Sequence, residues 1–170
     1  GMKENAGTFV LQPDKTRPEQ PAQDDKQMFD ALKARIEGGA PRILAANIHE
    51  VDRAGHYGAD GEYVADVHVI DENLADFWKW LKTEQADYLK NTLVIVTTDH
   101  GRHTIDKPGL EQKWREHGDS CAGCRSQPLM VLGGNIEGGQ ILEGTWTQRE
   151  VSSLISGWME IDQPWSEGLA

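Results

Sequence analysis

The sequence predicts an α/β protein with a mostly parallel sheet, and three stretches carry this prediction. Thr92–Thr98 is a nearly continuous run of β-prone residues, the pattern of a strand buried on both faces. Ile43–Ile48 is a second such run. Between these runs, from about Glu62 to Tyr88, apolar residues recur at the spacing of an amphipathic helix. A strand, a helix and a strand in this order predict a right-handed crossover that places both strands in one sheet.

The residues before these elements predict one further helix. Residues 1–23 hold several prolines among charged residues and glutamines, so we expect an extended leader with a possible short strand at Thr8–Gln12. Asp24 or Asp25 can cap a helix, which the glycine pair at 38–39 would end.

The last third of the chain predicts a long loop, a strand and a helix. Residues 102–126 lack periodicity and read as an excursion over the sheet edge, and loops of that length are usually functional or disordered. Residues 128–132 form a further short strand. Thr147 and Glu150 have the spacing of a capping box for a helix that ends near residue 159.

Composition and charge narrow the class of protein. The chain of 170 residues is one domain or part of a larger one, and its net charge of −11 argues against a nucleic-acid surface or an anionic membrane as partner. No apolar run approaches the roughly 20 residues that span a bilayer. Gly1 before Met2 is typical of the residue that a protease leaves after cleavage. The N-terminus shows no signal-peptide core, and the sequence leaves the cellular compartment of the protein open.

The two cysteines, Cys121 and Cys124, form one C-x-x-C pair. A zinc ribbon needs a second pair, which the sequence lacks. A thioredoxin-like redox motif needs a strand-to-helix setting that this stretch does not predict, and Gly123 lies inside the pair. Two interpretations stay open, a local disulfide that braces the loop and a pair of thiols.

Polar residues follow both predicted central strands. The crossover would bring the ends of these strands to the same edge, so residues 52–56 should lie beside Asp99 and His100. On a helical turn Asp52 and His56 share one face, and zinc accepts both a carboxylate oxygen and an imidazole nitrogen. Asp99 and His100 are either further ligands or a strand-end carboxylate beside a solvent-facing histidine.

A third ligand must come from elsewhere in the chain, and we select His117 in the long loop. His49 precedes the site by a few residues, His68 lies within the long helix, and His103 points into the start of the loop. We expect these three imidazoles to be solvated or hydrogen-bonded.

Taken in order, D-R-A-G-H at 52–56, T-T-D-H-G at 97–101 and the His-Gly pair at 117–118 resemble the metal motifs of the alkaline phosphatase superfamily. Within it they are most similar to the branch of phosphatases, phosphodiesterases and cofactor-independent phosphoglycerate mutases. The resemblance implies a three-layer αβα sandwich with a mostly parallel sheet. It also implies hydrolysis of small-molecule phosphate mono- or diesters.

The resemblance assigns metal ligands residue by residue. Asp52, His56 and His117 would hold one divalent ion, and Asp99 and His100 would sit on a second. Sulfatases of the same superfamily usually carry Asp-Asn in place of Asp99-His100. Imidazole ligands favour zinc, with manganese as the alternative.

The resemblance covers residues 24–162 and lacks one part of the family pattern, a Ser or Thr nucleophile at a helix N-terminus. No serine precedes Ile43, and Thr16 lies between prolines where no helix is expected. We therefore expect the C-terminal half of a metallohydrolase domain, truncated on its N-terminal side, followed by a tail at 163–170. Alone it would be inactive, with an incomplete second site.

Two further expectations follow from the truncation. A truncated sheet would leave an exposed edge, which favours a homodimer or a domain swap. The alternative function is a degenerate domain of the same fold that binds a metal or a partner without catalysis.

Overall fold

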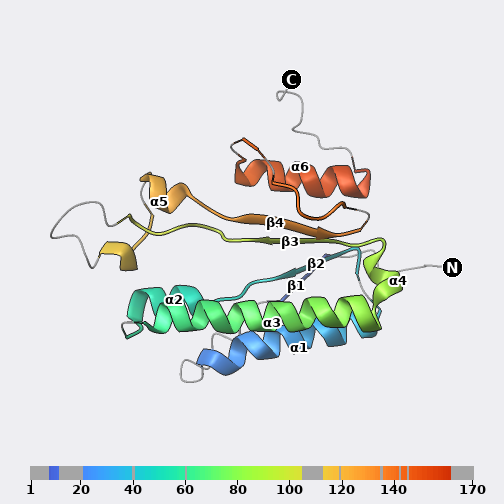
Figure 1. The fold of residues 1–170 in the computed structure, drawn as a ribbon, viewed down its shortest axis with the longest axis horizontal. Coiled ribbons are helices and arrows are strands. Elements are labelled where there is room, and N and C mark those ends of the chain that lie inside the picture. The colour runs from blue at the N-terminus through green and yellow to red at the C-terminus, as the bar shows by residue number, and fades with distance from the viewer. Residues whose placement is uncertain are drawn as a thin grey trace.

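In the computed structural model the strands lie between helices. The structure describes residues 8–11, 21–39, 41–59, 61–104, 113–118, 120–134, 136–141, 143–144 and 146–161. Helices α1 (Pro21–Glu37) and α3 (Glu62–Glu84) lie on one side of the strands and α6 (Gln148–Met159) on the other (Figure 1). The molecule is therefore a mixed α/β protein with helices on both sides of its strands.

The strands form two separate pairs. β1 (Thr8–Leu11) runs parallel to β2 (Ile43–Ala46), whereas β3 (Leu93–Thr97) runs antiparallel to β4 (Leu129–Gly133). The prediction of a mostly parallel sheet was thus wrong for the described strands, and β2 and β3 are not hydrogen-bonded neighbours. The chain after β3 returns at the end where β3 finishes, which pairs Thr97 with Leu129 and makes β4 run back along β3.

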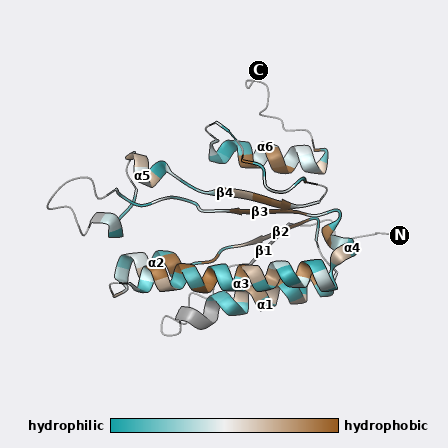
Figure 2. Ribbon diagram, viewed as in Figure 1, coloured by the Kyte–Doolittle hydropathy of each residue, from teal (hydrophilic) through white to brown (hydrophobic). Residues whose placement is uncertain are grey.

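The central strands are also less buried than their composition predicts. Side chains of β3 are half-buried from Leu93 to Val96, and Thr97 is exposed. The last residues of β2 are exposed as well. Each described sheet is two strands wide, and the side chains of β2, β3 and β4 stay partly open to solvent. Figure 2 shows that β3 and β4 nevertheless carry the most continuous hydrophobic colouring of the chain.

The buried core lies between α1 and α3. Phe29 and Ile36 from α1 meet Phe77 and Leu81 from α3, and the rings of Phe29 and Phe77 are 5.9 Å apart. Helix α3 starts where the sequence predicts, but it ends at Glu84 and the single turn α4 (Ala86–Leu89) follows. The core therefore fixes the position of α3, and the chain that leaves the C-terminal end of α3 continues through β3 to the candidate site.

The elements at the two ends of the chain match their predictions in part. The strand expected near residue 8 is present, but α1 begins at Pro21, before the predicted aspartate cap. Proline is favoured in the first turn of a helix because its missing N–H has no partner there. The rest of the expected leader, including Thr16, and the tail at 163–170 lie outside the described residues.

Helix α6 is capped and packed as its sequence signature predicts. The Thr147 side chain accepts the backbone N–H of Glu150, and the Glu150 carboxylate accepts the backbone N–H of Thr147. The Trp158 ring lies against Gly134, where an added Cβ would come within 2.4 Å of it. The contact between Trp158 and Gly134 places α6 against the end of β4. Among the described helices, none combines the length and the apolar character that a membrane span requires.

A buried carboxyl supports the start of α2 (Glu50–Tyr57) from outside that helix. Asp25 is 3% exposed, and its Oδ1 accepts the backbone N–H of His49, the N-cap of α2, at 3.4 Å. Burial raises the pKa of Asp25 from 3.8 to about 6, the His49 N–H opposes the rise, and the charge of Glu50 adds to it.

The raised pKa of Asp25 predicts a pH-dependent effect of Asp25→Asn. The folded state holds the proton more tightly than the unfolded state, so the stability contributed by this carboxyl is complete below 3.8 and is lost as pH rises through about 6. The amide of the variant does not titrate. The free energy of unfolding of the Asp25→Asn variant, relative to that of the wild type, should therefore rise by about 2 to 3 kcal/mol between about pH 4 and pH 7. Urea titrations across this range measure the difference, and a constant difference would contradict the prediction.

Candidate metal centre

Helix α2 presents Asp52 and His56 on one face, as their spacing predicts. Asp52 Oδ1 lies 3.6 Å from His56 Nε2. Both side chains are partly shielded, with 34% and 26% of their surface exposed. The helix thus offers one oxygen and one nitrogen donor to the same point in space.

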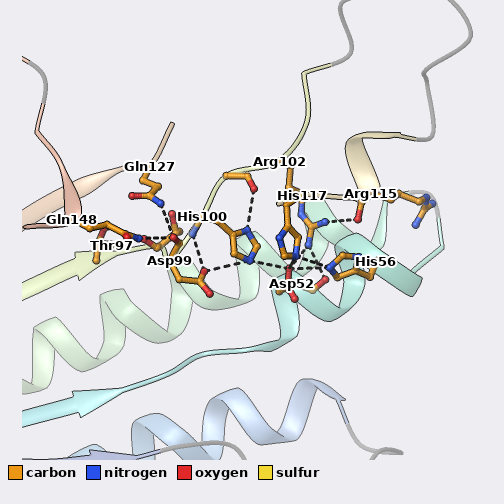
Figure 3. Close-up of polar contacts among 12 residues, drawn as sticks. Asp52, His56, Thr97, Asp99, His100, Arg102, Arg115, His117, Gln127 and Gln148 are labelled. Carbon is orange, nitrogen blue, oxygen red and sulfur yellow. Dashed lines mark hydrogen bonds and ion pairs between the residues drawn. The ribbon is translucent and has the colours of Figure 1, made fainter. Parts of the chain in front are cut away.

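Two more imidazoles reach this point from other parts of the chain (Figure 3). His117 Nε2, from the segment after the 3-10 turn η1 (Lys113–Arg115), lies 2.9 Å from His56 Nε2 and 3.7 Å from Asp52 Oδ1. His100, which follows β3, stacks on His117 with ring centroids 3.5 Å apart and places its Nε2 3.8 Å from Asp52 Oδ1. The structure therefore brings the two strand ends and the loop histidine together, although β2 and β3 are not paired.

Arg102 fixes the central carboxylate and was missed by the sequence analysis. Its Nη2 donates to Asp52 Oδ1 at 2.6 Å and to the Asp52 carbonyl at 2.8 Å, and its Nη1 donates to the Arg115 carbonyl at 2.7 Å. The guanidinium also lies 5.5 Å from the centre of the Tyr63 ring. The only signal in the sequence is that Arg102 directly follows the D-H-G motif.

The glycine of D-R-A-G-H makes room for this arginine. A Cβ at Gly55 would lie 2.2 Å from Arg102 Cζ. The other charged residue of the motif, Arg53, points elsewhere and pairs with Glu50 at 2.6 Å and Glu62 at 2.8 Å. The motif therefore has two roles. Asp52 supplies a carboxylate to the cluster, and Gly55 leaves space for the guanidinium that binds this carboxylate.

The surroundings of His117 favour its neutral, metal-binding form. Burial lowers the pKa of His117, and the neighbouring His100 adds to this effect while Asp52 opposes it. His117 is consequently neutral at pH 7, the form that binds metals. The Nδ1 of His100 lies 3.0 Å from the Gly101 carbonyl, so the tautomer that donates there leaves its Nε2 with a lone pair.

Asp99 lies at the open margin of the cluster. Its side chain is 86% exposed, and its Oδ1 is 3.6 Å from His100 Nε2. Two glutamines hold its backbone carbonyl, Gln127 at 2.6 Å and Gln148 from α6 at 2.5 Å. The C-terminal helix thus helps to set the path of the chain after β3.

The three histidines that the sequence analysis did not select as metal ligands differ in their surroundings. His49 forms the N-cap of α2, and His68 is exposed on α3. His103 does not point into open loop as expected, because its Nδ1 lies 3.4 Å from both Cys121 Sγ and Cys124 Sγ. The two cysteines are not joined in a disulfide.

This geometry defines a mixed α/β protein with a candidate metal centre, because donor atoms of Asp52, His56 and His117 all lie within 4.8 Å of one another. A family model described as type I phosphodiesterase / nucleotide pyrophosphatase matches residues 12–145 of the 170. The chain belongs to this family, which is part of the alkaline phosphatase superfamily. The family resemblance found in the motifs is thereby confirmed, and members of the family typically use divalent metals. Comparisons with curated proteins and with solved structures gave no match.

Replacing Arg102 tests its role as the anchor of Asp52. Arg102→Met keeps much of the side-chain volume but leaves the Asp52 carboxylate and the Arg115 carbonyl without this donor. We expect the free energy of unfolding to fall by about 1 to 3 kcal/mol. The matched control is Arg125→Met, at an exposed arginine, which should change stability by less than about 0.5 kcal/mol. Equal effects of the two substitutions in urea titrations would refute the assignment.

Proposed function

We propose that this chain carries the metal-binding part of a phosphoric-ester hydrolase centre, in which Asp52, His56 and His117 hold the first divalent ion. One observation carries the proposal: three donors of the types that transition metals prefer converge from a helix and a distant loop segment. Membership of the phosphodiesterase family supports phosphate esters as the substrate class.

The distances fit a bound transition metal. In a tetrahedral zinc site, bonds of about 2.0–2.1 Å place neighbouring nitrogen and oxygen donors about 3.3 Å apart. The corresponding separations here are 2.9 Å between the two Nε2 atoms and 3.6–3.7 Å from each Nε2 to Asp52 Oδ1. Small side-chain shifts would equalise them. Two imidazoles and one carboxylate favour zinc, with manganese as the second choice.

His100 and Asp99 are the proposed ligands of a second ion. His100 Nε2 is 3.8 Å from Asp52 Oδ1, so a metal on His100 would neighbour the first site. When bound at these residues, the second ion would join the first in supplying positive charge to the attacking and the leaving oxygen of a phosphoryl group. Asp99 and His100 alone are too few ligands for a firm site, so the second ion should bind weakly to this chain.

The roles of the chain's own residues follow from their contacts. Arg102 orients the Asp52 carboxylate and neutralises part of its charge. The carbonyl of Gly101 fixes the ring of His100 and its tautomer. No Ser or Thr of the chain is assigned as nucleophile. Thr16 lies between prolines where no helix is expected, and it falls outside the described residues.

A metal titration tests the first site. In a Cys121→Ser/Cys124→Ser background, so that no thiolate competes, calorimetry should detect binding of Zn²⁺ by the chain. His56→Ala together with His117→Ala should weaken the affinity by about 100-fold or more, because two of three donors are lost. The control His68→Ala removes an exposed imidazole from α3 and should leave the affinity unchanged. Unaltered affinity in the double variant would overturn the proposed site.

Hydrolysis assays distinguish the active from the degenerate form of the proposal. With p-nitrophenyl phosphate or its diester and added Zn²⁺ or Mn²⁺, we expect slow turnover, because no nucleophile is assigned and the second ion should bind weakly. The residual rate should vanish in the His56→Ala/His117→Ala variant. A chain that binds metal but shows no rate above that variant would be the non-catalytic domain, an alternative favoured by the incomplete second site. A fast rate would show that the chain contains an unassigned nucleophile.

A further inference from the structure

A second group of metal-binding side chains lies next to the first, and it has different chemistry. His103, Cys121 and Cys124 each offer a donor atom, and these atoms all lie within 4.8 Å of one another. His103 Nδ1 is 3.4 Å from each of the two sulfurs. Cys124 is buried, with 6% of its surface exposed, while His103 and Cys121 are half-buried.

We propose that His103, Cys121 and Cys124 form a structural zinc site, separate from the Asp52–His56–His117 centre. In a tetrahedral site with Zn–S bonds of about 2.3 Å and a Zn–N bond of about 2.0 Å, sulfur and nitrogen ligands stand about 3.5 Å apart. The observed separations of 3.4 Å match this spacing. Three protein donors leave one position for water. Two thiolates and one imidazole select zinc over the harder manganese, magnesium and calcium ions.

The backbone around the cysteines orients one of the two sulfur atoms. The N–H of Cys124 donates to Cys121 Sγ at 3.3 Å, a contact that fixes the direction of this sulfur. This contact arises because the C-x-x-C pair begins the single helical turn α5 (Ala122–Arg125), a turn that the sequence did not predict. When zinc binds, both cysteines lose their thiol protons to solvent and no electrons are exchanged.

The site joins two chain segments that approach closely. The N–H of Gly101 donates to the Cys124 carbonyl at 2.9 Å, and the N–H of His103 donates to the Glu116 carbonyl at 3.3 Å. A Cβ at Gly123 would lie 2.2 Å from the Arg102 carbonyl, so only glycine lets the cysteine turn pack against this strand exit. The glycine inside the C-x-x-C pair is therefore explained by packing.

The position of the site indicates its task. His100 and Arg102 point to the Asp52 cluster, whereas His103 points to the cysteines. An ion on His103 and the cysteines would tie the exit of β3 to the segment that contributes His117. The ion at the cysteine site would thus position the donors of the Asp52–His56–His117 centre without touching a substrate.

Cobalt substitution tests this site directly. The full chain, reduced and freed of metal, is titrated with Co²⁺, whose bonds to thiolates give a charge-transfer absorption that carboxylate and imidazole ligands do not produce. In the His56→Ala/His117→Ala chain, where the first site does not compete for the metal, we expect this absorption to saturate at one Co²⁺ per chain and to disappear when Zn²⁺ is added. Its absence in the reduced wild-type chain would overturn the proposal.

Variants separate the two sites. His103→Ala should weaken Co²⁺ affinity at the thiolate band by roughly 100-fold, and Cys121→Ser with Cys124→Ser should abolish the band. The band should persist in His56→Ala/His117→Ala and in the control His68→Ala. If His103→Ala leaves band and affinity unchanged, the proposed ligand set is wrong.

A stability readout covers variants that fold poorly. Added Zn²⁺ should raise the thermal unfolding midpoint of the His56→Ala/His117→Ala chain, because the cysteine site is intact there. Adding His103→Ala to that chain should make the rise smaller, because the cysteine site then loses one of its three donors while the first site is absent from both chains. Equal shifts in these two chains would contradict a zinc site at His103.

Discussion

The arrangement of the candidate site depends on one carboxylate oxygen. Asp52 Oδ1 accepts a hydrogen bond from the Arg102 guanidinium at 2.6 Å. It also lies 3.6–3.8 Å from the Nε2 atoms of His56, His100 and His117. The ion pair is well shielded on the arginine side, where 11% of the side chain is exposed, so it is less screened than a surface pair. It connects helix α2 to the exit of β3 by side-chain contact, in place of the strand pairing that a continuous parallel sheet would provide.

Around this oxygen the chain separates two kinds of metal chemistry. The residues that follow β3 supply His100 and Arg102 to an oxygen- and nitrogen-rich cluster and His103 to a sulfur-rich one. Transition metals sort by ligand softness, so the sulfur-rich cluster selects against manganese, whereas the oxygen- and nitrogen-rich cluster accepts zinc or manganese. The proposed function and the proposed structural zinc therefore rest on different atoms, even though they share one segment.

The sequence predicted the candidate site better than the sheet. Helical spacing placed Asp52 beside His56, and the polar residues after each apolar run indicated the strand exits. Apolar composition did not predict which strands pair, because hydrogen-bond partners and strand direction depend on where the connecting segments return. β3 and β4 are antiparallel because the chain that leaves β3 at Thr97 enters β4 at Leu129, directly opposite Thr97, a property that no local pattern in the sequence reveals.

Three contacts depended on the fold alone. Arg102 lies fifty positions from Asp52, His103 eighteen from Cys121, and Gln148 forty-nine from Asp99. Local periodicity carries no information about such pairs, since each side chain taken alone resembles a solvated loop residue.

The sequence by itself determined which metal-binding groups the chain contains. These groups are the Asp52–His56 pair on one helix, the D-H-G motif after a strand, the loop histidine and the C-x-x-C pair, and all of them follow from residue type and spacing. The tertiary structure decided which of these donors meet. Convergence requires the long α3 to pack on α1 through Phe77 and Leu81 and the cysteine turn to pack on the glycine at 101. Packing of this kind is a property of surfaces that come together in space, and spacing along the chain cannot specify it.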